Sequence, residues 1–313
     1  MPSSPKPPLV LIVGPTGVGK TDVAIKLAER LDGEIVSADS RLFYRGMDIG
    51  TAKPTLQHRA RVPHHLIDIA FPDEAITLAE FQARAGRAIA AIHGRHRLPL
   101  LVGGTGQYVR AVTEGWQPPR VRPAPRMRAE LAALQQERGT DWLHARLASL
   151  DAAAARKIDH RNSRRTVRAL EVIFATGRRF SEQRVARASP YKWLSLGLRR
   201  PRAELYARID ARIASMFQAG LLEEVRNLLA RGYAAALPSM SAIGYRECIR
   251  VLSGDLTIDA AQAEIRRLTR VLVRRQANWF KESDPAIKWF LAGEPTAESM
   301  AALVRRWLLP DGD

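Results

Sequence analysis

The sequence predicts an α/β fold in which a doubly wound, mostly parallel sheet carries an inserted all-helical domain. Short apolar runs alternate with helix-like stretches in the first third of the chain, a proline-rich stretch then stops the alternation, and apolar runs return after residue 190. Strands that alternate with helices are typical of parallel sheets, which bind ligands at the carboxyl ends of their strands.

Six apolar runs are expected to be the strands of this sheet. The first reads "LVLIV" and the last reads "AIKWFL". Helical patterns at residues 21–31 and 78–93 separate the early runs, because apolar residues recur there with the spacing of one helix face. The expected strands span residues 9–13, 33–38, 64–69, 98–104, 193–198 and 286–291.

The middle of the chain has a different character. The stretch "WQPPRVRPAP", which begins at Trp116, breaks the rhythm of strands and helices. Residues 126–176 then read as consecutive helices, and helices dominate again after residue 200. We therefore predict a discontinuous core of residues 1–115 and 190–313, and a helical insertion of residues 116–189.

Positive charge is concentrated in the second part of the chain. The formal net charge is +17 and the pI is about 10.9. Residues 161–212 alone hold 14 basic residues against 4 acidic ones, and most of the excess is arginine, which suits bidentate contacts with phosphates. An RNA or DNA partner is favoured, and a merely solvated basic face is the alternative.

The cysteine content and the length of the apolar runs bear on where in the cell the protein is expected. Cys248 is the only cysteine, so an intramolecular disulfide is excluded, which suits a reducing environment. The apolar runs are all shorter than the roughly 20 residues of a membrane span. We expect a cytoplasmic protein without membrane contact, and a monomer.

A phosphate-binding motif follows the first expected strand. Residues 14–21 read "GPTGVGKT" and match G-x-x-x-x-G-K-[ST] between a strand and a helix, as the motif requires. Backbone N–H groups and the helix N-terminus would hold phosphates, the lysine would add a charge, and the hydroxyl of Thr21 suits Mg²⁺. The fold is therefore expected to be P-loop NTPase-like, and a phosphate ester or diphosphate is expected to bind Gly14, Pro15, Thr16, Gly17, Val18, Gly19, Lys20 and Thr21.

Two further strand ends bring polar groups toward the same crevice. Asp39 follows the second expected strand, where a carboxylate could orient or deprotonate an acceptor, either a kinase's hydroxyl or another nucleophile. Thr105 follows the fourth strand, behind two glycines that allow close backbone approach. The alternatives are a loop-capping role for Asp39 and a glycine turn needed only for packing.

The acidic group typical of P-loop ATPases is hard to find. Asp68 lies inside the expected strand 64–69 instead of after it, so a convincing Walker-B carboxylate is missing and an ATPase is disfavoured. His64 and His65 are adjacent, and adjacent side chains of a strand point to opposite faces, which disfavours a shared metal ion.

The motifs of this chain, in their order, resemble one family, the bacterial tRNA dimethylallyltransferases, which are also called tRNA isopentenyltransferases. The motifs span residues 9–281, and the long run "YRGMDIGTAKPT" is far more specific than the phosphate loop. They are "GPTGVGKT", "ADS", "YRGMDIGTAKPT", "PHHLIDI", "LLVGGTGQYVRA", "RRTVRALEV", "LYARIDARI", "GLLEEVRNLL", "SAIGYRE" and "RRQANWFK".

The resemblance implies the transfer of carbon instead of phosphate. The family moves a dimethylallyl group from dimethylallyl diphosphate to the exocyclic N6 amine of the adenosine at position 37, directly 3′ of the anticodon, in tRNAs that read codons beginning with U. N6-isopentenyladenosine and pyrophosphate are the products. The implied partners are the tRNA anticodon stem-loop and dimethylallyl diphosphate, with Mg²⁺ as the cofactor.

The resemblance also assigns roles to residues. Asp39 matches the family's general base, which the poorly nucleophilic adenine amine needs, and Thr105 is the second residue assigned to catalysis. Arg208 and Arg212 match positions near the diphosphate, whose negative charge grows as it leaves. The expected tRNA contacts are Asp39, Ser40, Arg41, Leu42, Thr105, Arg128, Arg164, Arg165, Thr166, Val167, Arg168, Ser241, Ala242, Ile243, Gly244, Tyr245, Arg246, Arg274, Arg275, Gln276, Ala277, Asn278, Trp279, Phe280 and Lys281.

The chain departs from the family pattern at four positions, and other functions remain open. The family commonly has glutamine at the position of Leu42 and proline at that of Ser163. It commonly has aspartate at the position of Ala124 and threonine at that of Asn278. A P-loop small-molecule kinase would use Asp39 on a hydroxyl but would leave the basic helical segments unexplained. A non-catalytic RNA-binding NTPase would need the missing carboxylate. Prenylation of free adenine nucleotides is disfavoured by the added arginine-rich segments.

Overall fold

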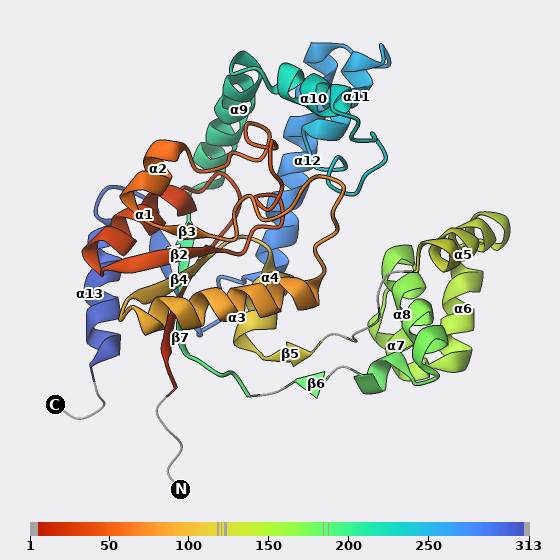
Figure 1. The fold of residues 1–313 in the computed structure, drawn as a ribbon, viewed down its shortest axis with the longest axis horizontal. Coiled ribbons are helices and arrows are strands. Elements are labelled where there is room, and N and C mark those ends of the chain that lie inside the picture. The colour runs from red at the N-terminus through yellow and green to blue at the C-terminus, as the bar shows by residue number, and fades with distance from the viewer. Residues whose placement is uncertain are drawn as a thin grey trace, which may run out of the picture. The chain divides into compact units, whose positions relative to one another are not determined.

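The computed structural model describes residues 6–117, 119, 121, 124–183, 185–186 and 188–309. The chain divides into two compact units. One unit, here called the core, comprises Met1–Thr113 and Ser189–Asp313, and the other, here called the helical unit, comprises Glu114–Ala188. Figure 1 labels the elements of both units.

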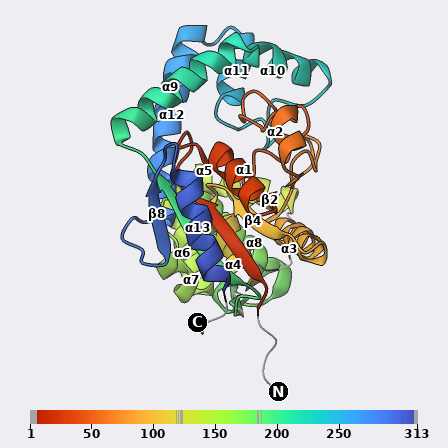
Figure 2. The ribbon, with the colours of Figure 1, turned by 90° about the vertical axis from the view of Figure 1, so that its left-hand side faces the viewer.

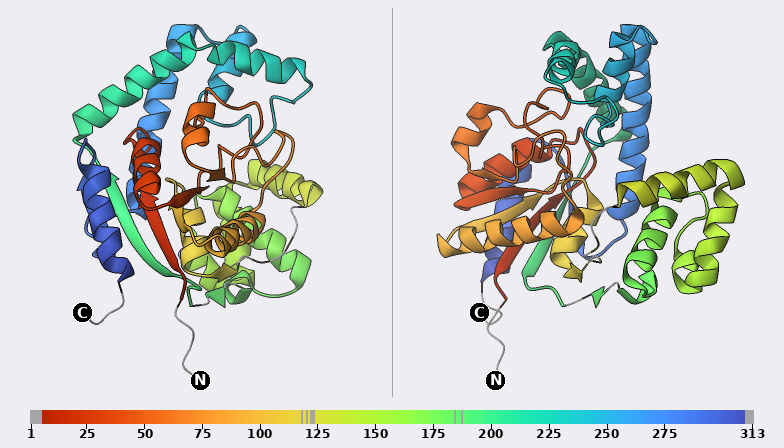
Figure 3. Two further views of the ribbon diagram at one scale, coloured as in Figure 1. Left: turned by 60° about the vertical axis from the view of Figure 1, so that its left-hand side comes forward. Right: turned by 45° about the vertical axis from the view of Figure 1, so that its right-hand side comes forward.

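Six strands form the sheet of the core. They are β1 (Pro8–Val13), β2 (Gly33–Ser37), β3 (His64–His65), β4 (Leu98–Val102), β7 (Lys192–Arg199) and β8 (Ile287–Leu291). Their spatial order is β3-β2-β4-β1-β7-β8, and each pair of neighbours is parallel. β1 and β7, far apart in the sequence, lie side by side (Figure 3, left). All six expected strands therefore lie in one sheet, and the predicted α/β fold is confirmed.

Helices cover both faces of this sheet. Alternate residues of β1 explain why, because Leu9, Leu11 and Val13 belong to one buried cluster while Val10 and Ile12 belong to another. The first cluster includes residues of α3 and α4, and the second includes residues of α1, α9 and α13. The helices of the core are α1 (Lys20–Arg30), α2 (Leu56–Arg61), α3 (Leu78–Gly94), α4 (Gly106–Thr113), α9 (Arg202–Gln218), α10 (Leu221–Ala230), α11 (Tyr245–Leu252), α12 (Ile258–Trp279) and α13 (Thr296–Leu308).

Four of these helices, α9 to α12, form a group of their own within the core. α9 contacts α10 and α12, and α11 contacts α10 and α12, so the four lie together at one end of the sheet (Figure 2). Leu205, Ile209 and Ile213 are buried on α9 and recur every fourth residue, which turns one face of this helix toward the core.

One expected strand is shorter than predicted. The run 64–69 ends as a strand at His65, because Leu66 and Asp68 have φ values of 63° and 56°. Such a left-handed backbone cannot continue the ladder of a sheet. Asp68 therefore lies on a turn beyond the strand, and its placement inside the strand was wrong.

The helical unit has a small cluster of buried hydrophobic side chains of its own. Leu143, Leu147 and Leu170 are among its buried residues. The helix Ala152–Lys157, capped by Asp151, lies within the stretch 126–176 that was expected to be helical. The elements of this unit are β5 (Trp116–Gln117), α5 (Pro125–Arg138), α6 (Thr140–Leu150), α7 (Ala152–Lys157), α8 (Ser163–Thr176), the 3₁₀ helix Phe180–Gln183 and β6 (Val185–Ala186), which pairs with β5 in antiparallel fashion.

Within the part of the chain that the structure describes, no helix has both the length and the apolar character that crossing a membrane requires.

Candidate active site

The phosphate motif forms a glycine-rich loop between β1 and α1. Gly14, Gly17 and Gly19 have φ values of 145°, 82° and 103°, which L side chains rarely adopt. A Cβ on Gly14 would lie 2.6 Å from the carbonyl oxygen of Leu198, and a Cβ on Gly17 would lie 2.8 Å from Cγ1 of Ile209. α1 begins without a side-chain cap. The loop thus requires glycine, and the N-terminus of α1 keeps N–H groups for an anion.

Lys20 is the first residue of α1 and folds back over the loop. Its Nζ donates hydrogen bonds to the carbonyl oxygens of Gly14 (3.0 Å) and Pro15 (2.8 Å). Burial lowers the pKa of Lys20 to about 8, an effect that the carboxylate of Asp39 opposes and the guanidinium of Arg212 increases. A neighbouring anion favours the charged form of a lysine, so a diphosphate in this loop would hold Lys20 protonated.

Two arginines of α9 reach the same loop. Arg212 donates from Nη2 to the hydroxyl oxygen of Thr16 (3.1 Å), and Arg208 donates from Nε to the carbonyl oxygen of Gly17 (3.2 Å). Nε of Arg212 is buried without a hydrogen-bond partner in the described part of the chain. The two arginines predicted to bind the diphosphate therefore contact the phosphate loop, although they lie 191 residues or more from their partners in the sequence.

A third arginine at the loop, Arg200, was missed by the sequence analysis. Its Nε donates to the carbonyl oxygen of Val18 (3.0 Å), its Nη1 contacts Glu204, and its side chain is 15% exposed. Arg200 directly follows β7, the neighbour of β1. A basic residue just past the carboxyl end of a late apolar run was the one signal that could have found it.

Asp39 lies just beyond β2 and caps its own loop. Its Oδ1 accepts a hydrogen bond from the backbone N–H of Arg41 (3.0 Å), and its own N–H donates to the hydroxyl of Ser37 (3.3 Å). Asp39 also lines a cavity of about 50 Å³ together with Lys20 and Thr21. A carboxylate has two oxygens, so capping with Oδ1 leaves Oδ2 for another partner. The capping alternative is observed, and it is compatible with a role in the site.

Oxygen donors that suit Mg²⁺ line the same cavity. They are the hydroxyls of Thr21 and Ser37 and the carboxylate of Asp39. Mg²⁺ is usually held by one or two protein oxygens, several waters and the phosphates of a substrate, so this donor set fits the ion. Among the described residues, no group of three or more His, Cys, Asp or Glu side chains could hold a metal ion.

Thr105 stands beyond β4 on a loop with close neighbours. A Cβ on Gly103 would lie 2.5 Å from the carbonyl oxygen of Ala38, and a Cβ on Gly106 would lie 2.3 Å from Cγ of Trp279. Thr105 is half-buried, and its carbonyl accepts the N–H of Tyr108 (2.9 Å) where α4 begins. Gly103 and Gly106 are therefore needed for these close approaches, and a catalytic role for Thr105 stays a prediction.

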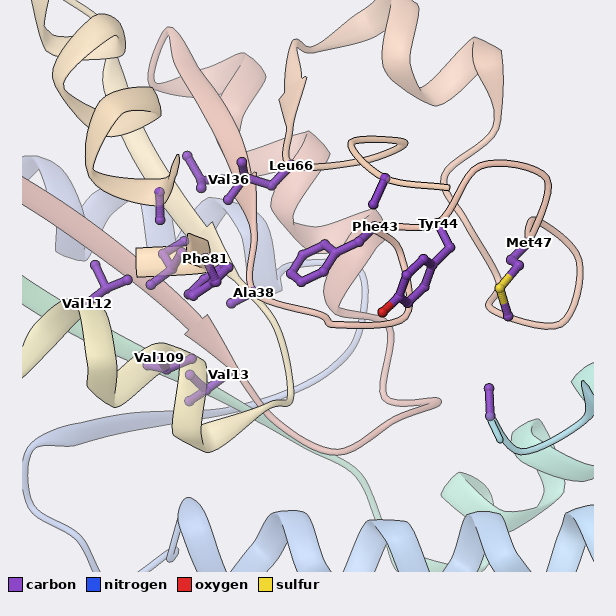
Figure 4. Close-up of a cluster of buried hydrophobic side chains, with 14 of the residues drawn as sticks. Val13, Val36, Ala38, Phe43, Tyr44, Met47, Leu66, Phe81, Val109 and Val112 are labelled. Atoms are coloured by element: carbon purple, nitrogen blue, oxygen red, sulfur yellow. The ribbon is translucent and has the colours of Figure 1, made fainter. Parts of the chain in front are cut away.

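Stacked aromatic rings join the segment after Asp39 to α4. The ring centroids of Phe43 and Tyr108 are 5.8 Å apart, and those of Phe81 and Tyr108 are 4.3 Å apart. Burial raises the pKa of Tyr108 to about 12. Figure 4 shows Phe43 and Tyr44 on this segment, with Phe81 and Val109 in the same cluster. The stack ties the Asp39 loop to the helix that follows Thr105.

The family-specific run around residues 44–55 is tied down by ion pairs. Nζ of Lys53 is buried, donates to the carbonyl oxygen of Tyr44 (2.7 Å) and pairs with Asp48 and with Asp68 (2.6 Å). Arg59 holds the other oxygen of Asp68 (2.7 Å). Burial alone would raise the pKa of Asp68, but these two cations outweigh it and lower the pKa. Asp68 therefore anchors this segment.

Glu224 of α10 holds the same segment from the other side. Its carboxylate accepts the consecutive backbone N–H groups of Asp48 (2.9 Å), Ile49 (2.7 Å) and Gly50 (3.2 Å). The hydroxyl of Tyr245 donates to it as well (2.6 Å). The specific "YRGMDIGTAKPT" run thus consists largely of residues that fix the loop after Asp39.

The predicted tRNA contacts of the core divide by exposure. The hydroxyl of Tyr245 donates to Glu224, Ala242 and Phe280 are buried among apolar residues, and Gly244 has no side chain. These four residues therefore offer no side-chain surface to RNA in this structure. The exposed members are Ser241, Arg246, Arg274, Arg275, Ala277, Asn278 and Lys281. The half-buried ones are Asp39, Ser40, Arg41, Leu42, Thr105, Ile243, Gln276 and Trp279, and the buried ones are Ala242, Gly244, Tyr245 and Phe280.

In the helical unit, a buried carboxylate engages two of the predicted arginines. Arg128 donates from Nε (2.9 Å) and Nη2 (2.8 Å) to Glu171, and Arg168 pairs with it too. Burial alone would raise the pKa of Glu171, but these bonds and one from the backbone N–H of Ala124 hold it at about 2. Arg164 and Arg165 are exposed, Val167 is half-buried and Thr166 is buried.

A parallel sheet whose first strand passes through a glycine-rich loop into a helix defines the core as P-loop NTPase-like. Residues 42–283 match the family model "IPP transferase", and residues 7–71 match "Isopentenyl transferase". The chain is 52% identical over 301 residues to a tRNA dimethylallyltransferase of Roseiflexus sp. strain RS-1, which covers 96% of this chain and 99% of the relative. It therefore belongs to the tRNA dimethylallyltransferase family.

Solved structures agree with this assignment. The tRNA isopentenylpyrophosphate transferase of Bacillus halodurans has a TM-score of 0.72 and 40% identity over 96% of each chain. A eukaryotic dimethylallyltransferase acting on tRNA has a TM-score of 0.78 and 25% identity over 96% of this chain and 77% of that one. The chain is thus a prenyltransferase that acts in tRNA modification, and the kinase alternative is not favoured.

Proposed function

We propose that this protein transfers the dimethylallyl group of dimethylallyl diphosphate to the N6 amine of the adenosine at position 37 of tRNAs that read codons beginning with U. A bond forms between N6 and the allylic carbon, the bond between that carbon and the diphosphate oxygen breaks, and N6 loses a proton. The observation that carries the proposal is family membership over nearly the whole chain.

The phosphate loop is the proposed seat of the diphosphate. The uncapped N-terminus of α1, Lys20, Arg208 and Arg212 all lie there. Negative charge grows on the diphosphate as the carbon–oxygen bond breaks, so donors placed in advance stabilise the transition state more than the ground state. These groups would hold pyrophosphate as it leaves.

Asp39 is the proposed general base. The lone pair of an adenine amine is delocalised into the ring, so the amine needs help to lose its proton as it attacks. Asp39 lines one cavity with Lys20 and Thr21 of the phosphate loop. Its carboxylate would accept the proton that N6 loses as N6 attacks the allylic carbon.

Mg²⁺ is the proposed cofactor, held by the hydroxyl of Thr21 and by the diphosphate. When bound, it would neutralise part of the diphosphate charge. The protein's own share is to orient the diphosphate through the loop and to keep Thr21 at the first turn of α1.

Exposed cations are the proposed contacts with the anticodon stem-loop. They are Arg164 and Arg165 of α8, and Arg274, Arg275 and Lys281 at the end of α12. Arginine suits phosphate contacts, and Trp279 beside Arg274 and Arg275 could add stacking on an unpaired base. We also propose that the protein works as a cytoplasmic monomer.

A labelling assay tests the proposal. Dimethylallyl diphosphate with a label in its carbon chain is incubated with Mg²⁺ and unmodified tRNA, AMP or ATP in separate reactions. We expect the label in tRNA alone, at adenosine 37, with one pyrophosphate released per label. Label in AMP or ATP would refute the proposed acceptor, and label in no acceptor would refute the transferase.

A substitution tests the base. Asp39→Asn keeps an oxygen for the N–H of Arg41 but cannot take a proton, so the single-turnover rate should fall by roughly 10²–10⁴ while tRNA affinity changes little. Asp73→Asn, on an exposed loop residue, is the matched control. A near-normal rate for Asp39→Asn would remove Asp39 from this role.

A further inference from the structure

The amide of Gln276 on α12 joins two loops of the site. Its Oε1 accepts the backbone N–H of Thr16 (2.8 Å), and its Nε2 donates to the carbonyl oxygen of Gly104 (3.2 Å). These contacts span 260 and 172 residues of sequence. A single side chain therefore connects the phosphate loop beyond β1 with the loop that carries Thr105 beyond β4.

The fit around this amide is close. A Cβ on Gly104 would lie 2.3 Å from Nε2 of Gln276, so glycine is needed for the contact. One turn further along α12, Trp279 packs against Gly106 at the other end of the Thr105 loop. The loop is thus held from α12 at two points, and Gln276 is the one that also reaches the phosphate loop.

The two neighbours of Gln276 on α12 face elsewhere. Arg275 and Ala277 are exposed, whereas Gln276 is half-buried and both ends of its amide are engaged within the core. An amide supplies an acceptor and a donor at once. An aliphatic side chain of the same size would leave the N–H of Thr16 and the carbonyl of Gly104 without these partners.

We infer that Gln276 is a positioning residue for the diphosphate, and that it acts by holding the phosphate loop in register with the Thr105 loop instead of contacting tRNA. The inference deepens the proposed function and rests on it, because it presumes that the loop binds the diphosphate. Groups that stabilise a leaving group must be held in place before the reaction. Gln276 provides that support from a helix whose exposed side carries arginines.

Gln276→Leu is the first test, because it keeps the size of the side chain and removes both hydrogen bonds. Without the two hydrogen bonds the phosphate loop is less well held before the diphosphate binds, and a tenfold loss of affinity corresponds to about 1.4 kcal/mol. We expect the dissociation constant of pyrophosphate with Mg²⁺, measured by calorimetry without tRNA, to rise about tenfold. The KM for dimethylallyl diphosphate should rise with it, while tRNA affinity by filter binding stays within about twofold.

Gln262→Leu is the matched control. Gln262 lies on the same helix and accepts a hydrogen bond from Arg266 of α12 (3.0 Å), so its substitution should leave the dissociation constant of pyrophosphate unchanged. Gln276→Leu with normal pyrophosphate affinity and weakened tRNA binding would overturn the inference in favour of a tRNA contact. Tighter pyrophosphate binding would overturn it as well, because the amide would then compete with the phosphate.

A double-mutant cycle keeps the inference testable if the leucine variant folds poorly. Gly104→Ala pushes the amide away from the opposite side, so it should weaken pyrophosphate binding by itself. In a Gln276→Ala background the added methyl loses its closest contact, and the next is the carbonyl oxygen of Gly14 at 3.2 Å, so Gly104→Ala should then have a clearly smaller effect. Equal effects in both backgrounds would contradict the inference. Wild-type protein that modifies no tRNA would refute the proposed function, whereas normal wild-type behaviour with additive variants would refute this inference alone.

Discussion

Two arginines of the core and two arginines of the helical unit meet different acceptors. On α9, Arg208 and Arg212 donate to a backbone carbonyl and a hydroxyl of the phosphate loop, which are neutral groups. In the helical unit, Arg128 and Arg168 share the buried carboxylate of Glu171. A guanidinium on neutral acceptors keeps its charge available to an anionic ligand, whereas one on a buried carboxylate is largely neutralised.

A basic segment can serve binding or stability, depending on the groups that its arginines contact. The positive charge of both units predicted a polyanionic partner. The groups that accept hydrogen bonds from the arginines show which arginines are free to bind such a partner and which stabilise the fold. Within the helical unit the same distinction sets Arg164 and Arg165, which are exposed, apart from Arg128 and Arg168. Each side of this comparison can be tested by substitution.

Among these arginines and their acceptors, the largest effect is expected at Arg212. Arg212→Ala removes a charged donor from the leaving diphosphate, so kcat/KM for dimethylallyl diphosphate should fall by about 10²–10³. Steady-state kinetics at saturating tRNA measures it. Arg202→Ala, at the exposed start of α9, is the control and should change kcat/KM less than twofold. A loss below about threefold for Arg212→Ala would mean that its charge does not serve the diphosphate.

The structural side of the comparison predicts a loss of stability. Glu171→Gln leaves two arginines without their carboxylate. Breaking a fully buried pair costs about 3–5 kcal/mol, but Arg128 and Arg168 are 42% and 30% exposed and water can replace part of the contact. We expect the free energy of unfolding in urea to fall by about 1–3 kcal/mol. Glu182→Gln, at an exposed pair, should change it by less than about 0.5 kcal/mol.

The pH dependence of that stability has a definite sign. The pKa of Glu171 is lowered to about 2 in the folded protein, so its ionised form stabilises the fold above the unfolded pKa of about 4.3. This contribution is lost as pH falls toward 2. The difference in unfolding free energy between wild type and Glu171→Gln should therefore be constant from pH 7 to about 5 and shrink below pH 4. A constant difference down to pH 3 would contradict the assignment.

The smallest expected effect is at the exposed arginines. Arg164→Ala combined with Arg165→Ala should weaken binding of all tRNAs alike by several-fold and flatten the dependence of log K on log salt by about 1–2, since each lost phosphate contact removes about 0.7–0.9. Titrations at several salt concentrations measure this slope. Arg138→Ala with Arg146→Ala removes two charges from α5 and α6 of the same unit and should leave the slope nearly unchanged. An equal change of the salt slope in both double variants would indicate that these arginines act only through the overall positive charge of the unit and make no specific phosphate contacts.

Local sequence determined the elements and the phosphate loop. All six apolar runs became strands of one sheet, and the central strands β1, β2 and β4 are buried on both faces, as near-continuous apolar runs of a parallel sheet are. The loop followed from glycines whose positive φ values other residues rarely adopt. The end of β3 could not be foreseen, since the left-handed turn at Leu66 and Asp68 is stabilised by Lys53 and Arg59 from another part of the chain.

Tertiary structure alone decided which polar side chains meet. Arg200 and Gln276 reach the phosphate loop across 182 and 260 residues. Arg200 is marked in the sequence only by its place after an apolar run, and nothing in the immediate neighbours of Gln276 distinguishes it from other amides. Glu171 looked like one more residue of an amphipathic helix until packing buried it between Arg128 and Arg168. The physical reason is that a motif specifies backbone geometry locally, whereas the partner of a charged or amide group is set by how distant elements pack.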